Sequence, residues 1–401
     1  MKKRPLIAAF ALFLALVLSL GFAVPTLAND EYEQERDFIN MDFEWAPPPT
    51  PELPDSQARE EVARAISLEL VPYFVCSDYT EAVTRAEFCC MVSILYSRVT
   101  ETMLTERVLF NDTDDYDVQL MGALGVVSGD GKGNFYPDRA ITRQEAALMI
   151  SRLAEAMGRP LPKEPPSFSD NSSISGWAFE AVGQVQAAKI MTETGNNSFS
   201  PKAVFTREQS IVAISRMFDR ELPIGWARED VARAISLKLV PVGLRSDYNQ
   251  AITRAEFCHL AVRFYTNNLG AITERVTFSD CADPNVELMG ALGVVSGDGK
   301  GRFAPNRDMT RQEAATMIAR LLDAMGEKAF GRTLPMQEPT FDDNGSISDW
   351  AFEAVGQMQA AGIMGGTGNN RFSPVRPYTR EQSIVTVLKL DDLFLNLQWT
   401  D

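Results

Sequence analysis

Histidine and cysteine are both scarce in this chain of 401 residues. The only histidine is His259, and the five cysteines are an odd number, so at least one lies outside any intramolecular disulfide. Because their spacing matches neither a zinc site nor a redox motif, we expect no metal, no cofactor and no disulfide framework. Cys89 and Cys258 fall early in expected helices, which is typical of small buried hydrophobic side chains. His259 is expected to be buried or half-exposed.

Long apolar runs are absent after the first 28 residues. The chain begins with Lys2, Lys3 and Arg4, continues as an apolar run from Leu6 to about Val24, and reaches Thr26-Leu27-Ala28. This order is typical of a secretory signal peptide, predicted here as residues 1–28. No later run approaches the ~18 apolar residues that a membrane-spanning helix needs. We therefore expect a soluble, secreted protein with no transmembrane segment after signal cleavage.

Basic residues are outnumbered by acidic ones. The chain has 38 Lys and Arg against 54 Asp and Glu, and residues 1–28 contain three basic and no acidic residues. The net charge without residues 1–28 is therefore (38 − 3) − 54, or about −19. Nucleic acid is a poor partner for such a chain. An anionic ligand would have to be captured locally, by arginines and helix N-termini.

Catalytic motifs are missing as well. The sequence has no nucleophile elbow, no zinc-binding histidine pair and no Walker loop. Its carboxylates either recur as helix caps or are scattered, rather than paired as in glycoside hydrolases. We therefore expect that the protein is not an enzyme, and the less favoured alternative is a glycan-active enzyme.

What the chain does contain is a duplication. Residues 29–55 are acidic and then proline-rich, which predicts an extended linker. After it, residues 56–221 are repeated by residues 222–401, and Gly122–Gly133 returns unchanged as Gly290–Gly301. Repetition on this scale means that the sequence must first be interpreted as an array of units.

A Thr-Arg motif followed by Glu or Gln occurs three times in each half. Every copy fits the capping box Thr-x-x-Glu/Gln and leads into an apolar-periodic segment, so each predicts the start of a helix. The paired residues are Thr84 and Glu87, Thr142 and Glu145, Thr206 and Gln209, Thr253 and Glu256, Thr310 and Glu313, and Thr379 and Gln382.

Each motif opens the second helix of a unit that consists of a helix, a loop and a helix, which predicts an all-α fold. One such helical hairpin cannot bury its apolar stripe alone, so three units are expected to pack together. The predicted units span about 56–101, 108–158 and 166–218 in the first half, and 226–272, 276–326 and 339–395 in the second.

The arginine of the motif is not explained by capping. It falls on the first helical position, where the positive end of the helix dipole disfavours a cation by a few tenths to ~1 kcal/mol. Two explanations stay open: contact with an anionic ligand, or pairing with a carboxylate of a neighbouring unit.

Together these motifs resemble the S-layer homology family. The resemblance rests on Phe168-Ser169-Asp170, Trp177-Ala178, Gly125-Val126-Val127-Ser128-Gly129 and Ile252-Thr253-Arg254-Ala255-Glu256, and it covers almost all of residues 56–395. It implies two tandem triads, each with three repeats around a pseudo-threefold axis and grooves between neighbours.

The resemblance also implies a function: non-covalent binding to a secondary cell-wall polysaccharide, often pyruvylated, at the cell wall or S-layer. Arginine suits a pyruvate carboxylate, a tryptophan can stack on a sugar, and glycine loops let a sugar approach the backbone. Other S-layer or cell-surface proteins are possible partners, and an S-layer scaffold that binds proteins is the alternative. We favour Arg311 and Arg380, because Glu193 would repel an anion in the first half. The full set of expected ligand residues is Arg85, Arg143, Arg207, Arg254, Arg311, Arg380, Trp177, Trp350, Gly297 and Gly365.

Overall fold

The computed structural model describes residues 53–102, 104–326 and 335–398, and over these residues the chain is helical. The prediction of an all-α fold is confirmed, since the described residues form only isolated β-bridges and no strand. The predicted signal peptide and most of the predicted linker lie outside the described residues. The α-helices are α2 (Arg59–Ser67), α3 (Arg85–Thr100), α4 (Tyr116–Ala123), α5 (Arg143–Ala156), α6 (Phe179–Ala187), α7 (Arg207–Asp219), α8 (Arg228–Ser236), α9 (Arg254–Leu269), α10 (Pro284–Ala291), α11 (Arg311–Met325), α13 (Asp349–Ala360) and α14 (Arg380–Gln398).

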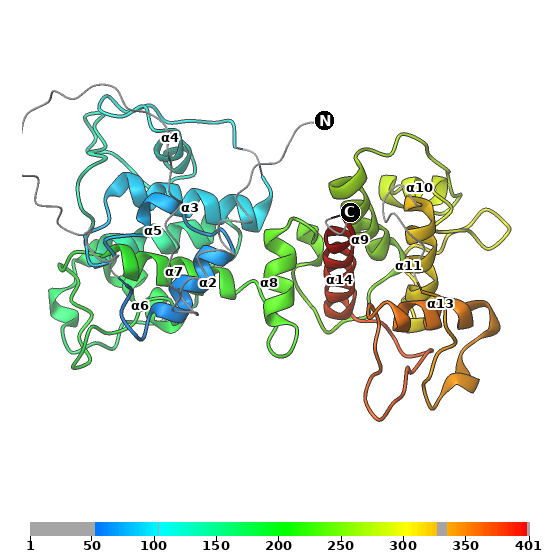
Figure 1. Cartoon of the computed structure of the whole chain (residues 1–401). Coiled ribbons are helices and arrows are strands. Elements are labelled where there is room, and N and C mark those ends of the chain that lie inside the picture. The colour runs from blue at the N-terminus through cyan, green and yellow to red at the C-terminus, as the bar shows by residue number, and fades with distance from the viewer. Residues whose placement is uncertain (1–52, 103, 327–334, 399–401) are drawn as a thin grey trace, which may run out of the picture.

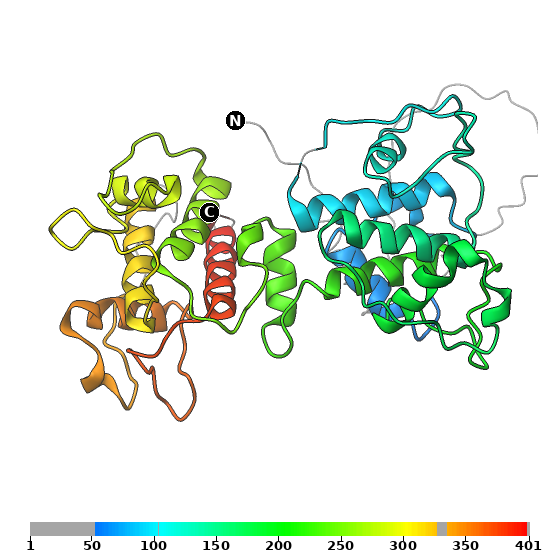
Figure 2. The same ribbon diagram turned by 180° about the vertical axis from the view of Figure 1, so that it is seen from behind.

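The helices form two lobes, as both views of the ribbon show (Figures 1 and 2). The first lobe contains α2 to α7 and the second contains α8 to α14. In the first lobe α2 packs on α7, α3 on α4 and α5 on α6. In the second, α8 packs on α14, α9 on α10 and α11 on α13. The duplicated sequence therefore repeats the same helix pairings.

Each lobe is closed at its centre by a ring of three backbone hydrogen bonds. In the first lobe Val83 N–H donates to Phe205 O (2.8 Å), Phe205 N–H to Ile141 O (2.9 Å), and Ile141 N–H to Val83 O (3.1 Å). All three side chains are buried, and each precedes the motif threonine of one unit. The second lobe has the same ring, formed by Ile252, Met309 and Tyr378. Three segments of each lobe are thus related in a cyclic order.

The motif threonines cap the helices that follow them. Thr84, Thr142, Thr253 and Thr310 each accept the N–H of the glutamate three residues later, and that glutamate accepts the threonine N–H in return. Thr379 exchanges the same two bonds with Gln382. Thr206 accepts from Gln209 N–H only, because the Gln209 amide oxygen accepts from Arg143 instead.

An aspartate holds each glycine-rich loop in shape. The Asp280 carboxylate accepts the N–H groups of Phe303 (2.7 Å) and Ala304 (2.8 Å), and these bonds lower the pKa of Asp280. Ala304 has φ of 57°, a left-handed conformation that costs roughly 1–2 kcal/mol and that the two bonds help to maintain. The same arrangement recurs at Asp112, Asp170 and Asp343. In each case the phenylalanine of the loop is buried in the core.

The cysteines and the histidine have structural surroundings. All five cysteines lie within the described residues and are free thiols. Cys89 and Cys258 are fully buried, and burial raises the pKa of both thiols, so they behave as small hydrophobic side chains. His259 is half-exposed, with Nε2 lying 2.6 Å from an oxygen of Asp283. Over the described part of the chain, no helix is long and apolar enough to cross a membrane and no His, Cys, Asp and Glu cluster could hold a metal.

Candidate functional site

Four of the six motif arginines reach across to the glycine-rich loop of the next unit. In Arg311, Nε donates to Phe372 O (2.8 Å) and Nη2 to Gly365 O (2.8 Å), and the guanidinium lies 4.9 Å from the centre of the Phe372 ring. Arg85, Arg143 and Arg254 bind their loops in the same way. These arginines therefore join neighbouring units, a role that the sequence did not predict.

The remaining two motif arginines bind carboxylates. Arg207 Nη2 lies 2.6 Å from Glu87, and Arg380 Nη2 lies 2.6 Å from Glu256. Both glutamates are caps of the first unit in the same lobe, which lacks the glycine-rich loop. For these two residues the structure shows pairing with a neighbouring carboxylate, one of the two explanations that the sequence left open.

The helix N-termini cannot serve as the expected anion sites, because their N–H groups already have partners. Arg311 N–H donates to Arg376 O (3.1 Å) and Gln312 N–H to Pro374 O (3.0 Å), while Thr310 accepts the next free N–H. The same bonds recur at the other motif helices. The expectation that these termini offer unpaired N–H groups to a ligand is wrong, since loop carbonyls of the adjacent unit occupy them.

The second lobe has a groove of about 340 Å³ beside Arg311. Two of the three guanidinium nitrogens are engaged by loop carbonyls, but Nη1 has no hydrogen-bond or ion-pair partner among the described residues. Burial lowers the pKa of Arg311, because the site withdraws the cation from water without giving it a carboxylate. Arg376 and Lys389 also line the groove, and no acidic residue does.

Trp226 forms part of the same groove. Its indole is 64% exposed, and Nε1 donates to Glu381 (3.1 Å), which orients the ring. Gly365 and Gly366 line the groove too, and Gly365 accepts the bond from Arg311. The groove thus combines an aromatic surface with three basic side chains, a combination that suits an anionic sugar.

The equivalent groove of the first lobe has a volume of about 430 Å³ and different chemistry. Arg143 is its counterpart of Arg311, but Arg143 Nη1 donates to Gln209 (3.2 Å), so all three guanidinium nitrogens are engaged. Burial lowers the pKa of Arg143 to about 10. Arg216, the other basic side chain, is bound by both oxygens of Glu61. The acidic residues that line this groove are Asp55, Glu193 and Glu208.

Sequence reasoning missed Trp226, Arg376 and Lys389 as groove residues. The signal lay in the comparison of the halves: Trp226 replaces Gln57, Arg376 replaces Ala203, and Gly366 replaces Glu193. Glu193 already favoured the second half as the site of an anionic ligand, whereas Trp226 and Arg376 lie outside the repeated motif.

Several expected ligand residues lie away from both grooves. Trp177 and Trp350 are about half exposed, at 54% and 55%, but line neither groove. Gly297 has a packing role, because a Cβ there would lie 2.8 Å from Arg302 O. Arg85 and Arg254 are half-buried and keep an Nη1 without a partner among the described residues.

An all-α array of repeated units with a basic groove is the class of protein that this geometry defines. Comparison with known proteins finds matches to one family model. Residues 116–147, 167–209, 279–315 and 340–382 match the S-layer homology domain, a non-catalytic domain that anchors S-layer and surface proteins to the cell wall. These segments contain the motifs at Thr142, Thr206, Thr310 and Thr379. The units at Thr84 and Thr253, which lack the glycine-rich loop, are not matched.

Several curated proteins are similar to parts of the chain. The chain is 37% identical to an S-layer protein of Bacillus thuringiensis subsp. finitimus over 20% of this chain and 9% of that protein. It is 26% identical to an amylopullulanase of Thermoanaerobacterium thermosulfurigenes over 61% of this chain and 12% of the enzyme. An endoglucanase of a Bacillus strain matches at 27% identity over 54% of this chain and 23% of the enzyme. The chain spans less than a quarter of the length of these relatives, and the matches indicate cell-surface or S-layer association.

Proposed function

We propose that this protein binds an acidic cell-wall polysaccharide non-covalently through the groove of the second lobe. The observation that carries the proposal is Arg311 Nη1, a donor without a partner among the described residues, in a groove lined by three basic and no acidic side chains. A carboxylate on a sugar, such as a ketal-linked pyruvate, accepts charge-assisted hydrogen bonds from such donors.

Arg311 is held in place before the ligand arrives. The carbonyls of Phe372 and Gly365 fix two nitrogens of the guanidinium, so that little side-chain entropy is lost when Nη1 binds an anion. Arg376 and Lys389 supply further positive charge, and Trp226 supplies a ring for the apolar face of the sugar. The lowered pKa of Arg311 supports this role, because an incoming carboxylate would compensate the buried cation.

We further propose that all six units are repeats of the S-layer homology type, arranged as one triad in residues 56–221 and another in residues 222–401. The closed ring of backbone bonds in each lobe supports this arrangement. The first unit of each lobe would be a divergent repeat, in which a short connection replaces the glycine-rich loop. The glutamate of its motif, Glu87 or Glu256, pairs with the motif arginine of the third unit, Arg207 or Arg380. Export through residues 1–28 would place the protein at the cell surface.

Sedimentation with purified cell-wall sacculi tests the proposal. The mature protein should bind intact sacculi and lose that binding after chemical removal of the secondary polysaccharide. Equal binding to stripped walls would contradict a glycan ligand. Binding that instead requires other surface proteins would favour the scaffold alternative.

A further inference from the structure

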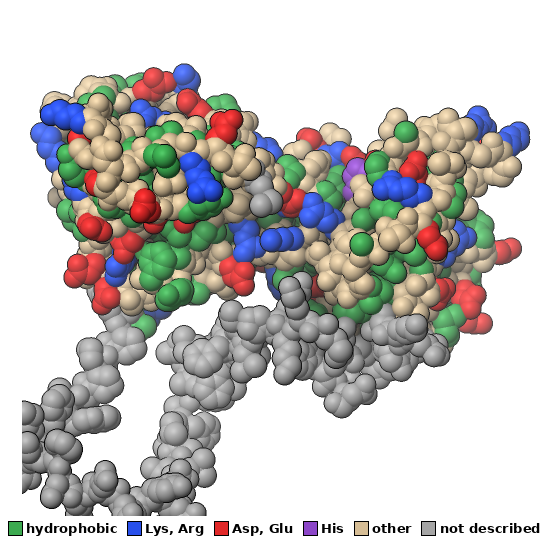
Figure 3. All heavy atoms as spheres, turned by 90° about the horizontal axis from the view of Figure 1, so that it is seen from above, with side chains coloured by type: hydrophobic (Ala, Val, Ile, Leu, Met, Phe, Trp, Pro, Cys, Tyr) green, Lys and Arg blue, Asp and Glu red, His purple; other side chains and the backbone are tan. Residues whose placement is uncertain are grey.

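The two lobes meet through equivalent parts of the duplicated halves. Ser236 Oγ donates to Leu68 O (3.1 Å), and Arg98 donates to Ser236 O. Ser236 is the second-half counterpart of Ser67, the residue beside Leu68. Contact between the same segment of two copies is how an isologous, twofold interface is built. Figure 3 shows basic side chains gathered where the lobes meet.

Glu101, which follows the last residue of α3, has an unfavourable backbone conformation and an unfavourably placed charge. It caps the helix with φ of 52°, a left-handed conformation in which a non-glycine residue is strained, and its negative charge lies at the negative end of the helix dipole. Its counterpart in the second half is Gly270, the residue type expected at a helix end. An interaction outside α3 must therefore hold Glu101 in place.

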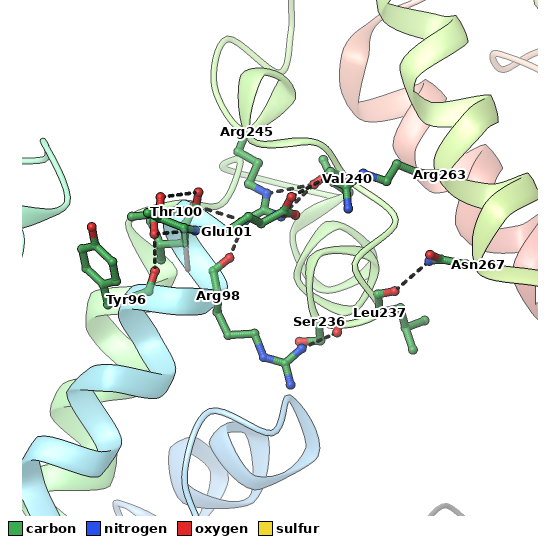
Figure 4. Close-up of polar contacts among 12 residues, drawn as sticks. Tyr96, Arg98, Thr100, Glu101, Ser236, Leu237, Val240, Arg245, Arg263 and Asn267 are labelled. Atoms are coloured by element: carbon green, nitrogen blue, oxygen red, sulfur yellow. Dashed lines mark hydrogen bonds and ion pairs between the residues drawn. The ribbon is translucent and has the colours of Figure 1, made fainter. Parts of the chain in front are cut away.

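That interaction comes from the second lobe. Arg245 Nη2 binds one oxygen of Glu101, and Arg263 Nη2 binds the other. The Arg245 side chain is only 2% exposed, and its Nη1 also donates to Arg98 O and Val99 O, carbonyls at the end of α3. Figure 4 shows Glu101, which follows α3, and the backbone carbonyl of Arg98 beside Arg245, whereas the Arg98 side chain extends to Ser236.

The counterparts of these three charges are uncharged. Cys76 corresponds to Arg245, Ile94 to Arg263, and Gly270 to Glu101. Two first lobes that met through this face would place Glu101 against Cys76 and Ile94. Two second lobes would bury Arg245 against Gly270, and a buried cation without a partner is strongly destabilising. Only a first lobe and a second lobe complement each other.

We propose that Glu101, Arg245 and Arg263 form an ionic lock that makes a quasi-twofold contact specific for one first lobe with one second lobe. The pairing does not depend on the connecting segment, so the two halves stay together when that segment is cut. The lock fixes the second-lobe groove relative to the rest of the molecule. It is independent of the polysaccharide proposal.

A cleavable linker tests the lock in the full-length chain. A protease recognition sequence is inserted between Ile224, which is 95% exposed, and Gly225, and the nicked protein is diluted and analysed by size-exclusion chromatography. We expect the two halves of the wild type to co-elute. Glu101→Gly, which copies Gly270, and Arg263→Ile, which copies Ile94, should each raise the dissociation constant of the nicked pair at least tenfold. Glu180→Gln, an exposed carboxylate paired with Lys163, is the matched control and should have no effect.

A second measurement separates loss of the lock from loss of folding. Circular dichroism should show the same helix content in every variant, and small-angle scattering of the uncut Glu101→Gly chain should show a larger radius of gyration than the uncut wild type. The lock is refuted if nicked wild-type halves separate while both remain helical. It is equally refuted if the Glu101→Gly halves dissociate no more readily than those of the control.

Discussion

The grooves of the two lobes are built on one scaffold and differ in charge. In both, a motif arginine binds two carbonyls of the next loop, and an aspartate holds that loop through two backbone N–H groups. In the second lobe the groove around the arginine is basic, whereas in the first it contains Asp55, Glu193 and Glu208. What the halves share therefore joins neighbouring units, and under our proposal what distinguishes them governs the binding of a ligand.

The largest effect on polysaccharide binding is expected when a glutamate equivalent to Glu193 of the first groove is placed in the second groove. Gly366→Glu copies Glu193 and places a carboxylate beside Arg311, which would occupy the free guanidinium donor. We expect binding to sacculi to fall at least a hundredfold, because one charge-assisted bond is lost and a repulsion is gained. Together these effects amount to ~3 kcal/mol or more. Gly366→Gln controls for size, because a Cβ there lies 3.1 Å from Arg371 O. Equal losses for both variants would indicate a steric effect and contradict the electrostatic explanation.

The next largest effect is expected from removing the groove arginine, and this effect should differ between the two lobes. Arg311→Ala should weaken polysaccharide binding by about 10- to 100-fold, which corresponds to the ~1.5–3 kcal/mol of a charged hydrogen bond. Arg143→Ala should leave binding nearly unchanged. Both should lower the melting temperature, since each removes two bonds to a neighbouring loop. A comparable loss of binding in Arg143→Ala would show that the first groove also binds.

The first groove should gain weak binding when it is made to resemble the second. Gln57→Trp with Glu193→Gly supplies the aromatic surface and removes one carboxylate. Tested in the Arg311→Ala background, this double change should restore binding several-fold, as measured by co-sedimentation. No recovery in a folded protein would mean that Asp55 and Glu208 still exclude the anion, or that groove charge does not govern binding.

Acid should destabilise both lobes alike, since the aspartate-held loops are common to them. Backbone N–H donors lower the pKa of Asp112 in the first lobe and of Asp280 in the second. A carboxylate with a lowered pKa contributes stability above its unfolded pKa of about 3.9, and that contribution is lost as the pH falls through the folded value. Thermal melts should be constant from about pH 6 to 5 and fall below about pH 4. A melting temperature that rises toward pH 3 would contradict this role.

Much of the scaffold could be predicted from the sequence because its signals are local. The Thr-x-x-Glu pattern, which spans only four consecutive residues, is enough to indicate where a helix begins. Thr84, Thr142, Thr253 and Thr310 are N-caps in the structure. The arginine's partners were not predictable, because Phe372 O and Gly365 O are distant in sequence and become neighbours only when units pack.

The site was harder to predict for a related reason. The motif is the same in both halves, whereas the second groove is distinguished by Trp226 and Arg376, whose first-half counterparts are Gln57 and Ala203. Arg380 had the same motif as Arg311, and only the fold reveals that Glu256 neutralises it. Trp350 is an exposed aromatic residue, but its helix does not direct it into the groove.

The most direct test of the account is a calorimetric titration of the intact mature protein with isolated acidic wall polysaccharide. Two double variants each remove two positive charges. In the second lobe they are Arg376→Ala and Lys389→Ala; in the first they are Arg216→Ala, at the counterpart of Lys389, and Lys202→Ala, beside Ala203, the counterpart of Arg376. We predict that the second-lobe variant binds about tenfold more weakly than the wild type and that the first-lobe variant binds within about twofold of it, by the energies typical of charged contacts. Equal weakening, or a greater loss in the first-lobe variant, would contradict the assignment of the ligand to the second-lobe groove.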